Sequence, residues 1–209
     1  MLLFGHTGIT AGVVKAYDIL VSMTKHGNSY RLDSSSKLGT VIAGEGSRPH
    51  YLLSGVEDRI GSIDYRVVLL GSLLPDIIDK PVWLLVTGDV SLSGRDYTHT
   101  LLFNLTLFIA GLVLIRYRKS WLLVISLSSF MHLILDQMWN SPDVLLWPLF
   151  GSLPKEETVG WWHNIFQALI SRPEVYIPEI VGLLLTLLFA YRLVKRRGVA
   201  GFIKSGVIV

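Results

Sequence analysis

A histidine and an aspartate four residues apart, His132 and Asp136, stand in a segment that is otherwise typical of a membrane helix. Residues at this spacing share one face of an α-helix, so both side chains are available to the same partner. Ionisable groups inside a membrane are costly unless they are paired, which makes the two residues a candidate functional site. The spacing suits two ligands of one metal ion, and a hydrogen-bonded pair or a proton relay is the alternative.

The composition indicates an integral membrane protein. The 209 residues are 51% hydrophobic and 17% charged, and the mean hydropathy of +0.50 is too high for an ordinary soluble domain. The chain has no cysteine, so a transition metal would have to be held by nitrogen and oxygen ligands. The net charge is +3, but the basic residues flank apolar segments, and we therefore expect membrane contacts and no nucleic-acid partner.

Several segments are candidates for membrane helices, because about 20 apolar residues cross the hydrocarbon core. Three are almost entirely apolar, and two contain charges or prolines and are expected to form broken or protein-buried helices. The sequence thus predicts an all-α fold, a polytopic membrane helix bundle of about five transmembrane or broken helices in a single integral membrane domain, residues 1–209. The apolar segments are 101–115, 121–138 and 177–194, and the interrupted ones are 1–23 and 67–86.

Two polar stretches connect these segments. Residues 25–65 are rich in serine and glycine and are predicted to form a flexible polar loop. Residues 139–176 contain several tryptophans and prolines, and a stretch such as 159–171 is predicted to lie as a helix at the membrane interface. Lysine and arginine are concentrated directly after segments 101–115 and 177–194. This distribution places those two helix ends in the cytoplasm and the 139–176 loop outside.

With this topology, further ionisable residues reach the level of the His132–Asp136 pair. Each helical residue rises about 1.5 Å, and counting from the cytoplasmic ends brings residues of three other segments into the outer, exoplasmic half. Three imidazoles and three carboxylates suit one or two zinc ions, with manganese or iron as alternatives, and an aspartate can bridge two ions. The predicted metal ligands are His6, Asp76, Asp79, His99, His132 and Asp136.

These residues also have simpler interpretations. Asp79 lies between Pro75 and Pro81, in a run that could be a helix break with an aspartate cap. His6 could be an interfacial side chain, and His99 could simply start a helix. His163, between aromatic residues, and Glu179, near a helix start, are weaker candidates for the site, because an interfacial location and the helix dipole explain them equally well.

Five short motifs follow one another along most of the chain. They are Phe4-Gly-His-Thr-Gly8, Gly71-Ser-Leu-Leu-Pro-Asp-Ile-Ile-Asp79, Arg95-Asp-Tyr-Thr-His-Thr100, His132-Leu-Ile-Leu-Asp136 and Leu146-Trp-Pro-Leu-Phe150. Their order and spacing resemble the membrane-bound metal-dependent hydrolase family, also described as LexA-binding, inner-membrane-associated hydrolases. The resemblance implies a prokaryotic inner-membrane protein with a divalent-metal hydrolase site.

A more distant likeness is to the zinc-dependent phospholipase C and single-strand nuclease superfamily, which is helical and uses several zinc ions. The order of the predicted ligands, ending in the His132–Asp136 pair, is similar to the order in that superfamily. The superfamily completes its cluster with a further His-x-x-x-Glu motif, whereas this chain has glutamine in His163-Asn-Ile-Phe-Gln167. The resemblance therefore does not extend to a full three-zinc site.

The predicted reaction is metal-assisted hydrolysis, in which zinc lowers the pKa of a bound water toward about 7 and polarises a phosphoryl or acyl oxygen. Asp79 is expected to be a general base or a bridging ligand. Arg95 either clamps a phosphate or carboxylate at the mouth of the site or is a plain interfacial arginine. A phosphoester or ester of a lipid or lipid-linked molecule is the expected substrate. The alternatives are an ion-coupled transporter or channel, and an interaction protein with a structural metal.

Overall fold

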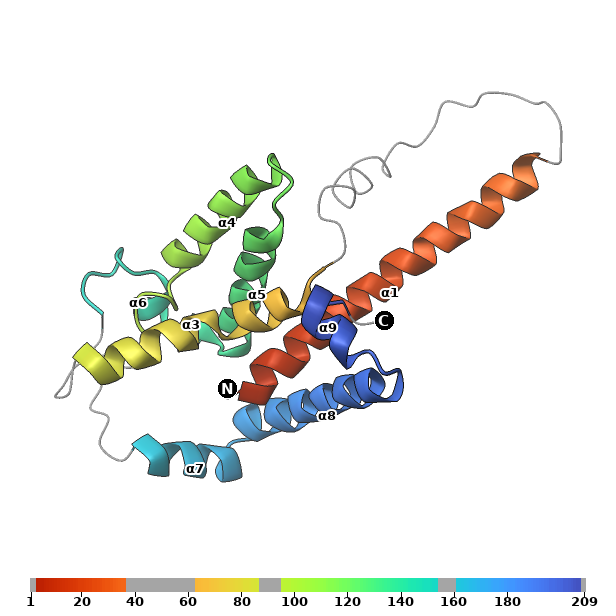
Figure 1. Cartoon of the computed structure of the whole chain (residues 1–209). Coiled ribbons are helices and arrows are strands. Elements are labelled where there is room, and N and C mark those ends of the chain that lie inside the picture. The colour runs from red at the N-terminus through yellow and green to blue at the C-terminus, as the bar shows by residue number, and fades with distance from the viewer. Residues whose placement is uncertain (1–2, 37–62, 87–94, 154–160, 208–209) are drawn as a thin grey trace.

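The computed structural model of the chain describes residues 3–36, 63–86, 95–153 and 161–207. All regular elements within these ranges are helices, so the predicted all-α class is confirmed. Figure 1 shows their arrangement. In chain order the elements are α1 (Leu3–Ser36), α3 (Tyr65–Val86), α4 (Leu101–Ile115), α5 (Trp121–Leu135), the 3-10 helix η1 (Met138–Asn140), α6 (Pro142–Leu145), α7 (Trp161–Ser171), α8 (Pro173–Lys195) and α9 (Val199–Ser205).

The first two helices are continuous, so of the two forms that the sequence predicts for these segments, broken or protein-buried, the broken form is wrong. α1 is a single helix of 34 residues, so residues 25–36 of the predicted flexible loop are helical, and this end of α1 projects beyond the other helices (Figure 1). α3 runs through both Pro75 and Pro81. A proline removes one backbone donor from a helix, and the hydroxyl of Thr98 donates to the carbonyl of Pro75 at 3.0 Å. This bond joins α3 to the segment before α4 beside the first of the two prolines.

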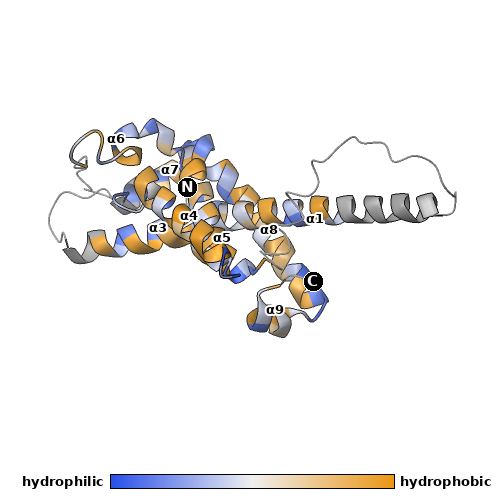
Figure 2. Cartoon of the chain, turned by 90° about the horizontal axis from the view of Figure 1, so that it is seen from above, coloured by the Kyte–Doolittle hydropathy of each residue, from blue (hydrophilic) through white to orange (hydrophobic). Residues whose placement is uncertain are grey.

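The described residues place apolar side chains outward and polar side chains inward. Hydrophobic residues run along α4, α5 and α8 (Figure 2), and many are exposed, whereas the buried residues include histidines, aspartates, serines and threonines. Among the described helices, α8 is long and apolar enough to cross a membrane, while α4 and α5 are apolar but have 15 residues each. Polar residues that face the interior and apolar residues that face outward are typical of helices packed in lipid.

Glycines allow the helices to approach closely at two crossings. A Cβ atom on Gly8 of α1 would lie 2.0 Å from the carbonyl oxygen of Gly182 in α8, and one on Gly182 would lie 2.0 Å from the carbonyl oxygen of Phe4. A Cβ atom on Gly71 of α3 would lie 2.8 Å from the carbonyl oxygen of Ile125 in α5. Small residues let membrane helices gain van der Waals contact where no hydrophobic effect drives their association.

Hydrogen bonds join the C-terminal helix α9 to the start of α3. The backbone N–H of Tyr65 donates to the carbonyl of Gly206 at 2.8 Å, and the Arg66 guanidinium donates to the carbonyl of Ile203 at 2.7 Å. The Tyr65 hydroxyl also donates to Asp18 of α1 at 2.5 Å. These bonds join α1, α3 and α9 at the end of the bundle distant from His6, because Asp18 lies about 18 Å along α1 from that residue.

Candidate metal centre

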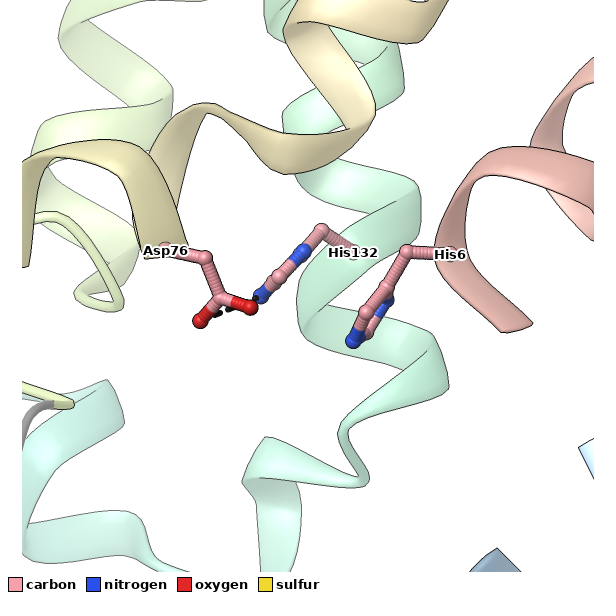
Figure 3. Close-up of side chains that lie close together, drawn as sticks. All are labelled: His6, Asp76 and His132. Carbon is pink, nitrogen blue, oxygen red and sulfur yellow. Dashed lines mark ion pairs between the residues drawn. The ribbon is translucent and has the colours of Figure 1, made fainter. Parts of the chain in front are cut away.

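Six ionisable residues from four chain segments meet near the N-terminal end of α1. Three buried imidazoles come from α1, α5 and the segment before α4, and three carboxylates come from α3 and the C-terminal end of α5. Figure 3 shows His6, Asp76 and His132 pointing toward a common space from three helices. The structure thus brings together all the residues predicted as metal ligands, which are His6, Asp76, Asp79, His99, His132 and Asp136.

His99 and His132 face each other through their Nε2 atoms. The Nδ1–H of His132 donates to the backbone carbonyl of Ser72 at 2.7 Å, and the Nδ1–H of His99 donates to Asp79 at 2.8 Å. A neutral imidazole has a single N–H, so the two Nε2 atoms, 3.2 Å apart, both present lone pairs. Two nitrogen ligands of one tetrahedral zinc ion lie about 3.3 Å apart. One ion between the rings therefore fits this separation.

Two aspartates place oxygen atoms near the same nitrogens. Asp76 Oδ1 lies 3.7 Å from Nε2 of His99 and 3.8 Å from Nε2 of His132. Asp136 Oδ2 lies 3.9 Å from Nε2 of His132. Three ligands about 2.1 Å from one ion and nearly in one plane with it lie about 3.6 Å apart, so one ion could contact both imidazoles and a carboxylate. This mixed set of nitrogen and oxygen donors suits zinc, manganese or iron.

His6 adds a third imidazole on the other side of the His132 ring. The two rings are stacked, with 3.8 Å between their centroids and 15° between their planes, and Nε2 of His6 lies 3.1 Å from Asp136 Oδ1. Within the described part of the chain, Nδ1 of His6 is buried and has no hydrogen-bond partner. The ligand atoms of His6, Asp76 and His132 lie within 4.8 Å of one another, so His6 could share an ion with His132 or, with an aspartate, hold a second ion.

Asp79 lies behind His99 instead of among the ligand atoms. Its Oδ2 accepts hydrogen bonds from Nδ1 of His99 and from the backbone N–H of Asp96, each at 2.8 Å. The backbone N–H of Thr98 lies 3.2 Å from both carboxylate oxygens. A carboxylate that accepts a hydrogen bond from a metal-binding histidine fixes the orientation of the imidazole ring and makes the imidazole more basic. The geometry therefore favours an orienting role for Asp79 over the predicted role of general base or bridging ligand.

Replacing Asp79 with asparagine should weaken metal binding about 10- to 100-fold, because the asparagine no longer holds the His99 ring through a charged acceptor. Competition with a chromogenic chelator measures this affinity in detergent-purified protein. Asp143→Asn is the matched control, because Asp143 is exposed on α6, and this variant should bind metal as the unmodified chain does. Equal affinity in Asp79→Asn and the control would contradict the orienting role.

Two partly exposed cations hold the carboxylates of the cluster. Lys80 Nζ lies 2.6 Å from Asp76 Oδ2, and Arg95 Nε lies 3.2 Å from Asp136 Oδ2. The side chains of Lys80 and Arg95 are 39% and 46% exposed, whereas the three histidines are fully buried. These two cations therefore connect the buried cluster with the protein surface.

The sequence profile of the family described as YdjM inner membrane protein matches residues 1–199. The chain belongs to this family. Membership of the YdjM family shows an inner membrane protein, and α8 is a helix that could span that membrane. No curated protein and no solved structure matches the chain. The more distant resemblance to the phospholipase C and nuclease superfamily thus has no support from these comparisons.

The two weaker site candidates of this YdjM-family chain lie apart from the ligand atoms. His163 is exposed on α7. Glu179 is buried in α8, where its Oε2 accepts a hydrogen bond from the backbone N–H of Phe4 at 3.1 Å. Neither residue is in the groups of ligand atoms around His132. Because Phe4 precedes His6 by two residues, Glu179 is instead placed to hold the start of α1 where His6 joins the cluster.

Several groups that shape the centre in this YdjM-family chain are not apparent from residue types. The carbonyl of Ser72 and the backbone N–H groups of Asp96 and Thr98 contribute through the main chain. The only sequence signal for the first is Pro75, which disturbs the hydrogen bonding of the preceding turn and so exposes carbonyls there. No signal marks the two backbone donors, because any residue except proline supplies an N–H.

Proposed function

We propose that this YdjM-family protein is a membrane-embedded, metal-dependent hydrolase. The observation that carries the proposal is the pair of Nε2 atoms of His99 and His132, which lie 3.2 Å apart. When both rings are neutral, each Nε2 presents a lone pair, because the other nitrogen of its ring donates a hydrogen bond. Zinc is the preferred ion, with manganese or iron as alternatives. Both rings would hold the first ion together with Asp76 or Asp136, and His6 would contribute to a second.

The same proposal places several helices in the membrane around this centre. Besides α8, the apolar helices α4 and α5 expose large side chains such as Leu105, Ile109, Leu127 and Phe130. A helix of 15 residues spans about 22 Å, which is less than the hydrocarbon core of about 30 Å. Short helices of this kind fit a bundle whose metal centre lies near one membrane surface. The distribution of basic residues in the sequence favours the exoplasmic surface.

A divalent ion held by these ligands would activate water and polarise the bond to be cleaved. The protein contributes fixed geometry, because Asp79 and Ser72 lock the two imidazoles. In the overall reaction the oxygen of one water forms a bond to phosphorus or to an acyl carbon. The ester bond to the alcohol oxygen breaks, and the alcohol oxygen takes up one proton from the same water. A lipid or lipid-linked phosphoester or ester is the proposed substrate, since a centre near the membrane surface meets headgroups directly.

The test is hydrolysis of fractionated bacterial lipids by detergent-purified protein that has been loaded with zinc. We expect one lipid class to be cleaved by the unmodified chain and not by His132→Ala. Cation flux into vesicles without turnover of any lipid would support a transporter instead and would contradict the hydrolase. Cleavage that persists in His132→Ala would show that another protein or another site is responsible.

A further inference from the structure

We propose that the metal centre recognises the phosphate of a phosphate ester, with Arg95 and Lys80 as its anion-binding groups and with an apolar ledge beside them for the lipid part of the substrate. The inference rests on the proposed hydrolase function and narrows its substrate from esters in general to phosphate esters.

The charge of the site is the first argument for an anionic substrate. Asp76, Asp79 and Asp136 provide three negative charges, and Lys80 and Arg95 provide two positive ones within the same network of contacts. With neutral imidazoles the group has a formal charge of −1, and one divalent ion changes it to +1. A loaded site of this charge, closed on its inner side by buried histidines, attracts an anion more strongly than a neutral ester.

The position of the two cations, Lys80 and Arg95, is the second argument. Lys80 holds Asp76 and Arg95 holds Asp136, and these two carboxylates approach the same Nε2 atom of His132, at 3.8 and 3.9 Å. The cations therefore stand just outside the ligands of one ion, on the exposed side of the cluster. Arginine binds phosphate through paired N–H donors and lysine binds it as a point charge. Both can turn from a carboxylate to a phosphate that enters.

Apolar residues that lie close to Arg95 in the chain are the third argument, which concerns a lipid part of the substrate. Tyr97 follows Arg95 by two residues, and its ring contacts that of Trp147 edge to face, with 5.4 Å between the centroids. Leu149 and Phe150 follow Trp147 and are 83% and 61% exposed. We call Tyr97, Trp147, Leu149 and Phe150 the apolar ledge. Because Tyr97 lies two residues from Arg95 in the chain, the apolar ledge and this cation together match a molecule with a phosphate at one end and hydrocarbon at the other.

The reaction balances with water alone. The oxygen of water forms a new bond to phosphorus, the bond between phosphorus and the ester oxygen breaks, and the released alcohol takes up one proton from the water. The products are a phosphate and an alcohol, and no oxidant or reductant is required. Arg95 and Lys80 would stabilise the negative charge on the phosphate oxygens throughout.

Binding to the metal-loaded, full-length protein tests the proposal without reliance on turnover. Isothermal titration with inorganic phosphate should show binding that weakens about 10- to 100-fold in Arg95→Gln, at unchanged metal content. Arg172→Gln is the matched control, because Arg172 is an exposed arginine at the N-terminus of α8, and it should bind phosphate normally. Equal binding by Arg95→Gln and the control would overturn the role of Arg95.

Short-chain phosphatidate and the corresponding neutral diacylglycerol distinguish a lipid phosphate from free phosphate. Phosphatidate should bind more tightly than inorganic phosphate, and replacing both Leu149 and Phe150 with serine should remove this difference while inorganic phosphate still binds. Diacylglycerol that binds as tightly as phosphatidate would overturn the proposal. A protein that holds metal but no phosphate would refute this inference alone, whereas a protein that holds no metal would refute the hydrolase as well.

Discussion

Replacing His132 with alanine should weaken the binding of a divalent metal by at least about 100-fold and abolish hydrolysis. His132 belongs to both groups of ligand atoms in the cluster, one with His6 and Asp76 and the other with His99 and Asp136. Its loss therefore affects either arrangement of ions. Metal content after dialysis, measured by mass spectrometry on protein purified in detergent, gives the result.

His163→Ala is the control for this experiment, because His163 is an exposed histidine on α7 and should leave the metal content unchanged. The alanine at position 132 also leaves the buried carbonyl of Ser72 without the donor it has now, which costs about 1–3 kcal/mol of stability. Asp136→Asn therefore serves as a second variant, and it should weaken metal binding, because Asp136 lies close to both His6 and His132. Unchanged metal in both variants would contradict the assignment of the cluster.

Replacing Gly182 with leucine should separate α8 from α1 and destabilise the protein by about 3 kcal/mol or more. A Cβ atom at this position would lie 2.0 Å from the carbonyl oxygen of Phe4 and 2.8 Å from the Cα atom of Gly5. Backbone atoms cannot move aside as a flexible side chain can, so the helices must part. Because Glu179 on the same helix accepts the N–H of Phe4, the separation should also displace His6 and weaken metal binding.

Thermal unfolding in detergent, followed by tryptophan fluorescence, measures the effect of Gly182→Leu. Gly201→Leu is the matched glycine control, because a Cβ atom on Gly201 of α9 would meet nothing within 4 Å. That variant should unfold close to the temperature of the unmodified chain. If Gly182→Leu also unfolded there and kept its metal, the close crossing of α1 and α8 would be refuted.

The elements and the convergence of the cluster could largely be predicted from the sequence, since both depend on simple geometry. Apolar segments of suitable length predicted α4, α5 and α8, and the spacing of His132 and Asp136 predicted that they share one side of α5. Nε2 of His132 and Oδ2 of Asp136 are 3.9 Å apart. Counting the rise along each helix from its basic end also predicted that residues of α1 and α3 reach the same level, because helical rise is nearly constant.

The division of roles within the cluster could not be predicted, because it depends on contacts between distant segments. Asp79 and Asp76 are both aspartates of α3, yet Asp79 accepts hydrogen bonds from His99 and from the backbone before α4, while Asp76 faces the ligand nitrogens. The continuity of α3 could not be predicted from the sequence either, because it depends on packing between distant segments. Local propensity predicts a break at Pro75, whereas α3 continues through Pro75 and packs against α5 and α1.

X-ray absorption at the zinc edge of the loaded protein tests the central claim most directly, because it reports the atoms that surround the ion. The cluster predicts nitrogen and oxygen neighbours at about 2.0–2.2 Å, with the outer-shell scattering of at least two imidazoles. That scattering should fall by one imidazole in His99→Ala. A spectrum without imidazole scattering, or one that is identical in His99→Ala, would show that the ion lies elsewhere and would contradict the metal centre.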